Sequence, residues 1–164
     1  MSNQSPRVPG SPKEELRAIR IIFGAIIAGA LIFAIIVLVL NMMQGPAAPE
    51  VKEYEHIFLY AAAGLAAVCF VIAISRYNKG ITLAKDSLIS LQDKLNQYRL
   101  SLVRYIALCE GPALFSIVAF FMTGNYFLFI ITGLMIIAML FKAPVLKRVT
   151  DDLELDWKQQ QELG

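Results

Sequence analysis

The sequence predicts an all-α polytopic membrane protein, a four-helix bundle of two transmembrane hairpins with a cytoplasmic amphipathic helix between them. Three observations support this prediction. Hydrophobic residues make up 57% of the 164 residues and charged residues only 17%, which is more apolar than a soluble domain. Charged residues are absent from 21–49, 57–75 and 111–141. These segments lack the polar–apolar alternation of a membrane β-barrel, so they are expected to be helices.

The apolar runs predict four spans, because a hydrocarbon core of about 30 Å is crossed by about 20 helical residues. The expected spans are residues 20–42, 56–76, 104–123 and 126–145, with the "TGN" of 123–125 dividing the last run. The first span is longer than the apolar core of a secretory signal, and Pro49 would obstruct cleavage after it. We therefore expect it to be retained as a transmembrane helix.

The distribution of basic residues predicts the orientation. Fourteen of the 15 Lys and Arg residues lie in the leader, the middle loop or the tail, or at the span ends that adjoin these three segments, and Lys52 is the exception. Since basic residues stay on the cytoplasmic side, both termini are expected there. The chain divides into a proline-rich, disordered cytoplasmic leader (1–12), a transmembrane domain (13–146) and a cytoplasmic tail (147–164).

The segment between the hairpins carries an apolar seam. Its members recur every three or four residues and predict a helix over 81–102: Ile81, Ala84, Leu88, Leu91, Leu95, Tyr98 and Leu102. We expect the "YNKG" of 77–80 to separate this helix from the second span, with Gly80 in a left-handed conformation. The helix is expected to lie along the inner membrane surface or to pack within the molecule. The alternative is a coiled-coil contact with a second copy or a partner.

Small residues repeat at a spacing of four in the first two spans. The first span contains the pairs Gly24/Ala28, Ala25/Gly29 and Ala30/Ala34, and the second contains "AAAGLAA" at 61–67. Such patterns allow close helix contacts in lipid, and we expect contacts inside the bundle. The alternative is an interface with another membrane protein or a second copy, as for the 81–102 helix. Membrane lipids are the other expected partners.

The remaining polar residues predict no enzyme. His56 has no second ligand at a metal-binding spacing, and the sequence shows no Ser/His/Asp or Cys/His arrangement. Cys69 and Cys109 lie in different apolar spans at no metal-binding spacing. We therefore expect no cofactor and no metal. Nucleic acid is not an expected partner, because the basic residues are explained by membrane topology. In the tail, Thr150 before Asp151 and Asp152 indicates the start of a helix, and Leu153, Leu155 and Trp157 would rest on the bundle or the membrane interface.

Two segments 87 residues apart indicate an internal repeat. "RAIRIIFG" from Arg17 and "RYIALCEG" from Arg104 share Arg, Ile and Gly at corresponding positions. Each would open a hairpin from the cytoplasmic side, so the chain is interpreted as two related hairpins in parallel orientation. The counterpart of Glu110 in the first hairpin is Phe23, so only one half carries an acid.

The segment "LCEGPALFSIVAFFMTGN", followed by an apolar span, a Pro and a "DDLEL" tail, resembles a family of small, uncharacterised four-span bacterial inner-membrane proteins. The resemblance is strongest over 100–155, around E-G-P-A-L-F, and it implies the architecture and a bacterial inner (plasma) membrane but no activity. There is also a loose similarity to the duplicated-hairpin proteolipids of rotary ATPases, which place one carboxylate in an outer helix. This chain lacks their dense glycine repeat, and its Glu lies toward the inner third of the bilayer.

Glu110 is the candidate functional residue, because it lies six residues, or roughly 9 Å, beyond Arg104 in the third span. A carboxylate there is expected to be paired or protonated. We predict an ion pair with Arg20, supported by the hydroxyl of Ser116 or Thr132, beside a backbone loosened by Gly111 and Pro112.

Two functions fit this acid. In the first, the pair holds the helices in register within an accessory or scaffold subunit that has no catalytic activity of its own. The alternative is proton, cation or small-solute transport using Glu110, since an acid within a membrane span is a functional candidate. The outer halves of the spans carry few polar residues that could relay an ion, which favours the first interpretation.

Overall fold

The computed structural model describes residues 11–85 and 90–163. Its elements are α1 (Pro12–Gln44), the 3₁₀ helix η1 (Pro49–Tyr54), α2 (Glu55–Ala84), α3 (Leu91–Thr123), α4 (Tyr126–Leu140), α5 (Leu146–Leu153) and α6 (Trp157–Leu163). The described residues form no strand, which confirms the all-α prediction.

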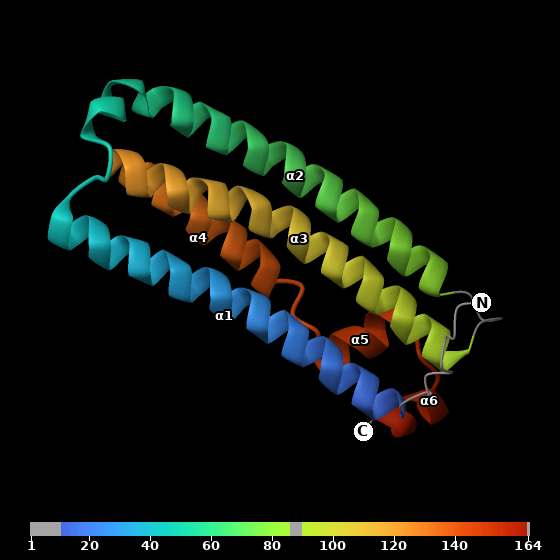
Figure 1. Ribbon diagram of the computed structural model, residues 1–164. Helices are drawn as coiled ribbons and strands as arrows, with labels where there is room; N and C mark the ends of the chain where they lie inside the picture. The colour runs from blue at the N-terminus through green and yellow to red at the C-terminus, as the bar shows by residue number, and fades with distance from the viewer. Residues whose placement is uncertain (1–10, 86–89, 164) are drawn as a thin grey trace, which may run out of the picture.

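The three longest helices run side by side, with α3 in the middle (Figure 1). α1 and α2 pack on either side of α3, and α4 also packs against it. At one end of the bundle, α1 begins, α2 ends, α3 begins, and α5 and α6 lie close by. We call this the basic end, since it carries Lys13, Arg17, Lys79, Lys147 and Arg148. The α1–α2 and α3–α4 connections lie at the opposite end.

α3 supplies more of the interior than any other helix. Its buried residues run along its whole length, from Leu91 to Thr123, whereas many large apolar side chains of α1 and α2 face outward. One core cluster contains Leu95 and Tyr98, and a second, further along α3, is built around Phe120. Because so much apolar surface faces outward, lipid rather than water suits the flanks of this bundle.

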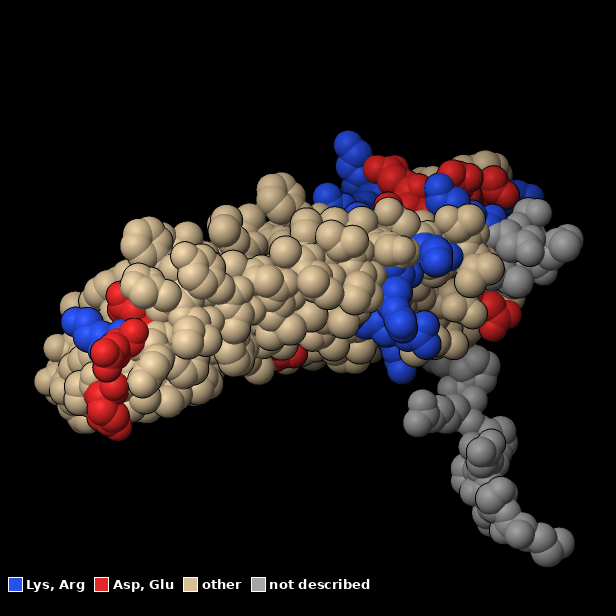
Figure 2. All heavy atoms as spheres, turned by 90° about the horizontal axis from the view of Figure 1, so that it is seen from above, with Lys and Arg blue, Asp and Glu red and all other residues tan. Residues whose placement is uncertain are grey.

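The charge distribution agrees with membrane insertion. α1, α2 together with η1, and α3 are each long and apolar enough to cross a membrane, and α4 is a shorter apolar helix. Figure 2 shows an almost uncharged flank between two charged ends. The predicted membrane protein with transmembrane helices is therefore supported by both the length and the surface of the helices.

α1 begins eight residues before the predicted first span, because its first turn is capped. The Ser11 hydroxyl accepts a hydrogen bond from the Glu14 N–H at 3.4 Å, and the Glu14 carboxylate accepts one from the Ser11 N–H at 3.1 Å. This capping box satisfies two backbone donors at the start of the helix. Of the predicted leader, residues 1–10 lie outside the described residues, and Ser11 and Pro12 already belong to the start of α1.

The prediction of a separate helix over 81–102 is wrong. Residues 81–84 continue α2, the backbone at Ser90 is extended, and residues 91–102 are the first part of α3. The described seam residues are buried together in one core cluster. The seam therefore packs α2 against α3 within the molecule, which was one of the two expected placements. It does not form a helix along the membrane surface.

The predicted helix break at 77–80 is also wrong, because α2 passes through these residues. Positive φ among the described glycines occurs at Gly45 and Gly124, not at Gly80. A Cβ at Gly80 would overlap the Ser101 Oγ and lie 2.9 Å from the Ser101 Cβ. Gly80 is thus a point of close helix contact rather than a helix terminator.

The fourth apolar helix and the tail differ from the prediction in their bounds. α4 ends at Leu140, not near residue 145, and Pro144 disfavours helix at the residue before it. α5 begins at Leu146, so Thr150 lies inside it instead of starting it. Leu153 and Leu155 are buried on the bundle, which is one of their two expected placements, whereas Trp157 is exposed.

At the opposite end, the α1–η1 connection caps α3. The N–H of Ala47 donates to the Phe121 carbonyl at 2.9 Å, and the N–H of Ala48 donates to the Met122 carbonyl at 3.3 Å. The Asn41 side chain reaches the Phe120 carbonyl at 3.5 Å. The bonds from Ala47 and Ala48 satisfy carbonyls at the end of α3, and the Asn41 contact fixes α1 against α3.

The small-residue repeats are only partly internal. Ala30 and Ala34 of α1 and Ala62 and Ala66 of α2 are buried, as expected. In contrast, Gly24, Ala25, Ala28 and Gly29 are exposed, and a Cβ at either glycine would meet nothing within 4 Å. The expectation of internal contacts is therefore wrong for these two pairs of α1, because that side of the helix faces away from α3.

Candidate functional site

Glu110 lies near the middle of α3 and is half-buried. Among the described residues it forms no ion pair or hydrogen bond. Ala107 and Gly111, its neighbours on α3, are exposed, and a Cβ at Gly111 would meet nothing within 4 Å. The carboxylate therefore borders a stretch of α3 where the backbone is open to close approach from outside.

Arg20 is placed elsewhere. Its Nε donates a hydrogen bond to the Pro144 carbonyl at 3.1 Å, so the side chain joins α1 to the α4–α5 connection at the basic end. The structure does not bring Arg20 and Glu110 together.

The register of α1 and α3 explains this separation. The Asn41–Phe120 hydrogen bond joins residues 79 apart in the chain, which sets Arg20 level with Arg99. Glu110 is eleven residues further along α3, or about 16 Å. The repeat alignment assumed an offset of 87, so it brought Arg20 too close to the acid.

The two predicted supporting hydroxyls do not serve Glu110 either. Ser116 is buried, and its Oγ has no hydrogen-bond partner in the described structure. Thr132 of α4 donates to the carbonyls of Ala113 and Leu128, at 3.3 and 3.4 Å. Thr132 thus fastens α4 to α3, in a place where Pro112 has interrupted the regular backbone hydrogen bonding.

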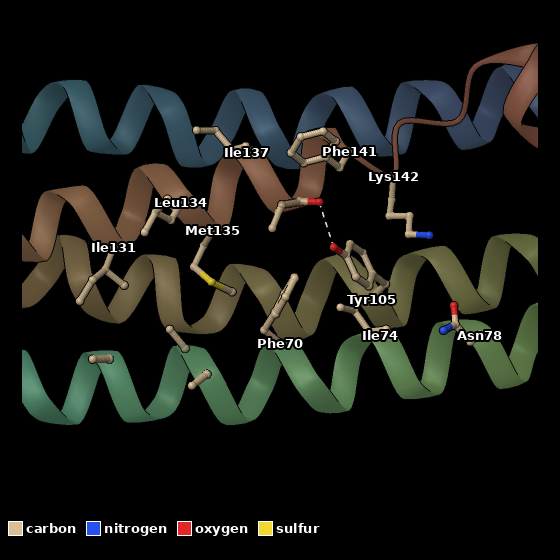
Figure 3. A pocket seen from close by; sticks show the side chains of 14 residues that line it. Phe70, Ile74, Asn78, Tyr105, Ile131, Leu134, Met135, Ile137, Phe141 and Lys142 are labelled. Carbon is tan, nitrogen blue, oxygen red and sulfur yellow. Dashed lines mark hydrogen bonds between the residues drawn. The ribbon is translucent and has the colours of Figure 1, made fainter.

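A groove between α2 and α4 has a volume of about 730 Å³. Figure 3 shows its apolar walls, which include Phe70 and Ile74 from α2 and Leu134 and Met135 from α4. Asn78 and Lys142 stand at one end of it, on the two sides. The groove is therefore apolar along most of its length and polar at the basic end.

The polar end of this groove rests on buried tyrosines. The Lys142 Nζ lies 4.4 Å from the centre of the Tyr77 ring, in a cation–π contact. Tyr77 meets the Tyr105 ring edge to face at 5.6 Å and donates its hydroxyl proton to Asp152 at 2.7 Å. Tyr105 donates to the Ala138 carbonyl at 2.9 Å, the dashed line in Figure 3.

This groove was not predicted from the sequence. Its walls are apolar residues of two spans. The spacing of these residues in the sequence does not indicate that α2 and α4 leave space between them. Tyr77, Tyr105 and Lys142 were the available signal, since aromatic and Lys side chains gather near the ends of membrane spans.

The described residues contain no group of three or more His, Cys, Asp or Glu side chains that could hold a metal ion. Cys69 is half-buried and Cys109 is buried, and both are free thiols.

Comparisons of the chain with protein families, with curated proteins and with solved structures gave no match. The resemblance to four-span bacterial inner-membrane proteins therefore stays a prediction.

Proposed function

We propose that this chain is an accessory or scaffold subunit of a bacterial inner membrane, with four spans, cytoplasmic termini and no catalytic activity of its own. The orientation is supported by the basic end, where Lys and Arg residues gather. In this proposal α4 is the fourth span. Its 15 residues cover roughly 22 Å, and the turn at 141–145 carries the chain to α5 at the basic end.

Glu110 carries the accessory function in this proposal. A carboxylate at this depth is costly in lipid unless another group satisfies it, and the described structure offers none. The exposed Ala107 and Gly111 beside it would let the helix of a second membrane protein approach closely. A donor on that helix would complete the site, and the unpaired acid would then select the partner.

The outward small residues of α1 provide further support. Gly24, Ala25, Ala28 and Gly29 form an exposed face where the α1 backbone is accessible. In membrane proteins such faces commonly pack against other helices. α1 would thus offer a second contact for the same membrane partner.

Transport of a proton, cation or small solute using Glu110 is the second candidate. One observation favours it: the Ser116 hydroxyl is buried without a partner, six residues further along α3. Both groups lie on α3, which packs more extensively than any other helix against the rest of the described bundle. In this function Glu110 would lie in lipid as a neutral, protonated acid and would need no ionic partner.

The experiment is extraction of the protein from its membrane in a lipid-preserving polymer, followed by mass spectrometry of everything recovered in stoichiometric amount. The accessory function predicts one such membrane protein, and Glu110→Gln is expected to reduce its recovery about ten-fold, since hydrogen bonds to charged groups are among the stronger ones. Glu53→Gln, an exposed acid in η1, is the matched control and should leave recovery unchanged.

The opposite result separates the two functions. If the chain is recovered alone, or if Glu110→Gln and Glu53→Gln behave alike, the accessory function is wrong. Proton flux into proteoliposomes that falls in Glu110→Gln, with the helix content intact, would then support transport.

A further inference from the structure

The groove between α2 and α4 has two polar groups with unused donors at its basic end. The Lys142 Nζ rests on the Tyr77 ring but has no hydrogen-bond partner in the described structure, and neither has the Asn78 side-chain amide. The Tyr105 hydroxyl on the groove floor is already used by the Ala138 carbonyl. The donors that face an occupant are therefore those of Lys142 and Asn78.

The groove has the length of one membrane leaflet. Along α2 it extends from Ala63 to Asn78, and the fifteen steps between these residues rise roughly 22 Å. One leaflet with its head groups measures about 20 to 22 Å, half of the full bilayer. Because α2 and α4 both run toward the basic end, Asn78 and Lys142 stand at head-group depth and the apolar walls stand beside the acyl chains.

The charge at the polar end selects the head group. Lys142 is a cation held in place by an aromatic ring, and Asn78 adds a neutral donor on the other side of the groove. A phosphate with no neighbouring ammonium complements this pair better than a zwitterionic head group does. Anionic lipids are also the lipids that basic residues attract on the cytoplasmic side.

We propose that the groove between α2 and α4 binds one anionic phospholipid of the leaflet at the basic end. Its phosphate accepts hydrogen bonds from Lys142 Nζ and the Asn78 amide, and one acyl chain lies along Phe70, Ile74 and Leu134. The inference rests on the membrane embedding in the proposed function and requires no protein partner.

The test is retention of lipid after reconstitution. The full chain is reconstituted into bilayers of equal amounts of phosphatidylglycerol and phosphatidylethanolamine and then extracted in mild detergent. Native mass spectrometry measures the mass of the protein with its bound lipid. The wild type is expected to keep one phosphatidylglycerol in preference to phosphatidylethanolamine. Lys142→Gln should lower that preference about five-fold, the effect of one basic residue at the membrane surface, and Lys142→Arg should keep it.

Two matched controls separate this site from general attraction. Lys147 is an exposed lysine of α5 outside the groove, and Lys147→Gln should leave the preference unchanged. Ala67→Phe fills the groove and should abolish retention, whereas Ala61→Phe, an exposed position of α2 outside the groove, should not. Circular dichroism of each variant checks that the helices are intact.

Several results would overturn the site. They are equal retention of the two lipids by the wild type, equal effects of Lys142→Gln and Lys147→Gln, and retained lipid in Ala67→Phe. Glu110 is not among the residues that line the groove, so Glu110→Gln should leave lipid retention unchanged. The proposal of a lipid site and the proposal of a protein partner can therefore be disproved independently of each other.

Discussion

Gly80 sets the distance between α2 and α3 near the basic end. A Cβ there would lie 2.9 Å from the Cβ of Ser101 and overlap its hydroxyl oxygen. Ser101 is held in place because its hydroxyl donates to the Gln97 carbonyl at 2.8 Å. The two backbones can approach this closely only because one of the two residues has no side chain.

Gly80→Ala is therefore expected to destabilise the bundle by about 1 to 3 kcal/mol, the usual cost of overpacking a tight contact. Unfolding in increasing denaturing detergent, followed by circular dichroism, measures the change. Adding Ser101→Gly removes both clashing atoms and should restore much of the loss.

Gly64→Ala is the matched control for this prediction. Gly64 lies in the same helix, and a Cβ there would meet nothing within 4 Å. It should be neutral or slightly stabilising, because alanine favours a helix more than glycine does. Equal stability of Gly80→Ala and Gly64→Ala would show that α2 and α3 do not meet closely at Ser101.

At the scale of the elements, two polar contacts join the α5 region to α2 and the residue that follows it. Tyr77 of α2 donates its hydroxyl to Asp152, and the Lys85 Nζ lies 2.6 Å from a carboxylate oxygen of Glu154. The second contact is exposed to solvent, so salt screens it. Its hydrogen bond from Lys85 lowers the pKa of Glu154. Any stabilisation from this pair is therefore present above the ordinary carboxyl pKa and is lost as pH falls through the lowered one.

The part-buried hydrogen bond between Tyr77 and Asp152 is expected to contribute more to stability than the exposed ion pair. Tyr77→Phe removes the hydroxyl donor to Asp152 while keeping the ring, and hydrogen bonds to charged groups contribute about 1.5 to 3 kcal/mol. The amides of α5 should then exchange with deuterium about ten-fold faster or more, as measured by hydrogen exchange and mass spectrometry.

Tyr105→Phe is the comparison variant, because it removes a hydroxyl that bonds the Ala138 carbonyl instead. It should speed exchange at the end of α4 and leave α5 unchanged. If α5 exchanges at the wild-type rate in Tyr77→Phe, its attachment depends on the buried Val149 and Leu153 rather than on Asp152.

At the scale of the whole molecule, the apolar runs were sufficient to predict the helical class, because lipid leaves a long uncharged segment few other structures. The seam from Ile81 to Leu102 was recognised as apolar, but it fitted equally well a surface helix and a buried hairpin. Its pattern does not say where a chain reverses. A glycine that ends a helix and one that allows close packing look alike in sequence, and Gly80 is of the second kind.

The candidate site was harder to predict. Glu110 was recognisable because an acid is rare within a span, but its partner depended on the register of α1 against α3. The short repeat gave a register eight residues away from the one that Asn41 and Phe120 define. The groove depended on the placement of α4, which no local pattern encodes. Pairings between helices therefore required the structure, whereas the helices themselves did not.

The crossing of α4 decides the final topology. With 15 residues, α4 is the shortest of the four apolar helices, and four spans require it to return the chain to the side where α1 begins. Tyr126 at its start and Gln161 in α6 are both exposed, so each can carry a thiol probe. If α4 crosses the membrane, these two positions lie on opposite sides of it. Gln161 is then on the cytoplasmic side, because segments rich in Lys and Arg stay there.

We therefore expect Tyr126→Cys to react with a membrane-impermeant maleimide from outside intact cells, and Gln161→Cys to react only in inverted vesicles. Both are made in a Cys69→Ala, Cys109→Ala background, and Glu53→Cys in η1 marks the outer side. Reaction of Tyr126→Cys and Gln161→Cys from the same side would mean three spans. The groove would then have its polar end in the other leaflet or outside the bilayer, so this labelling also tests the depth assigned to Lys142.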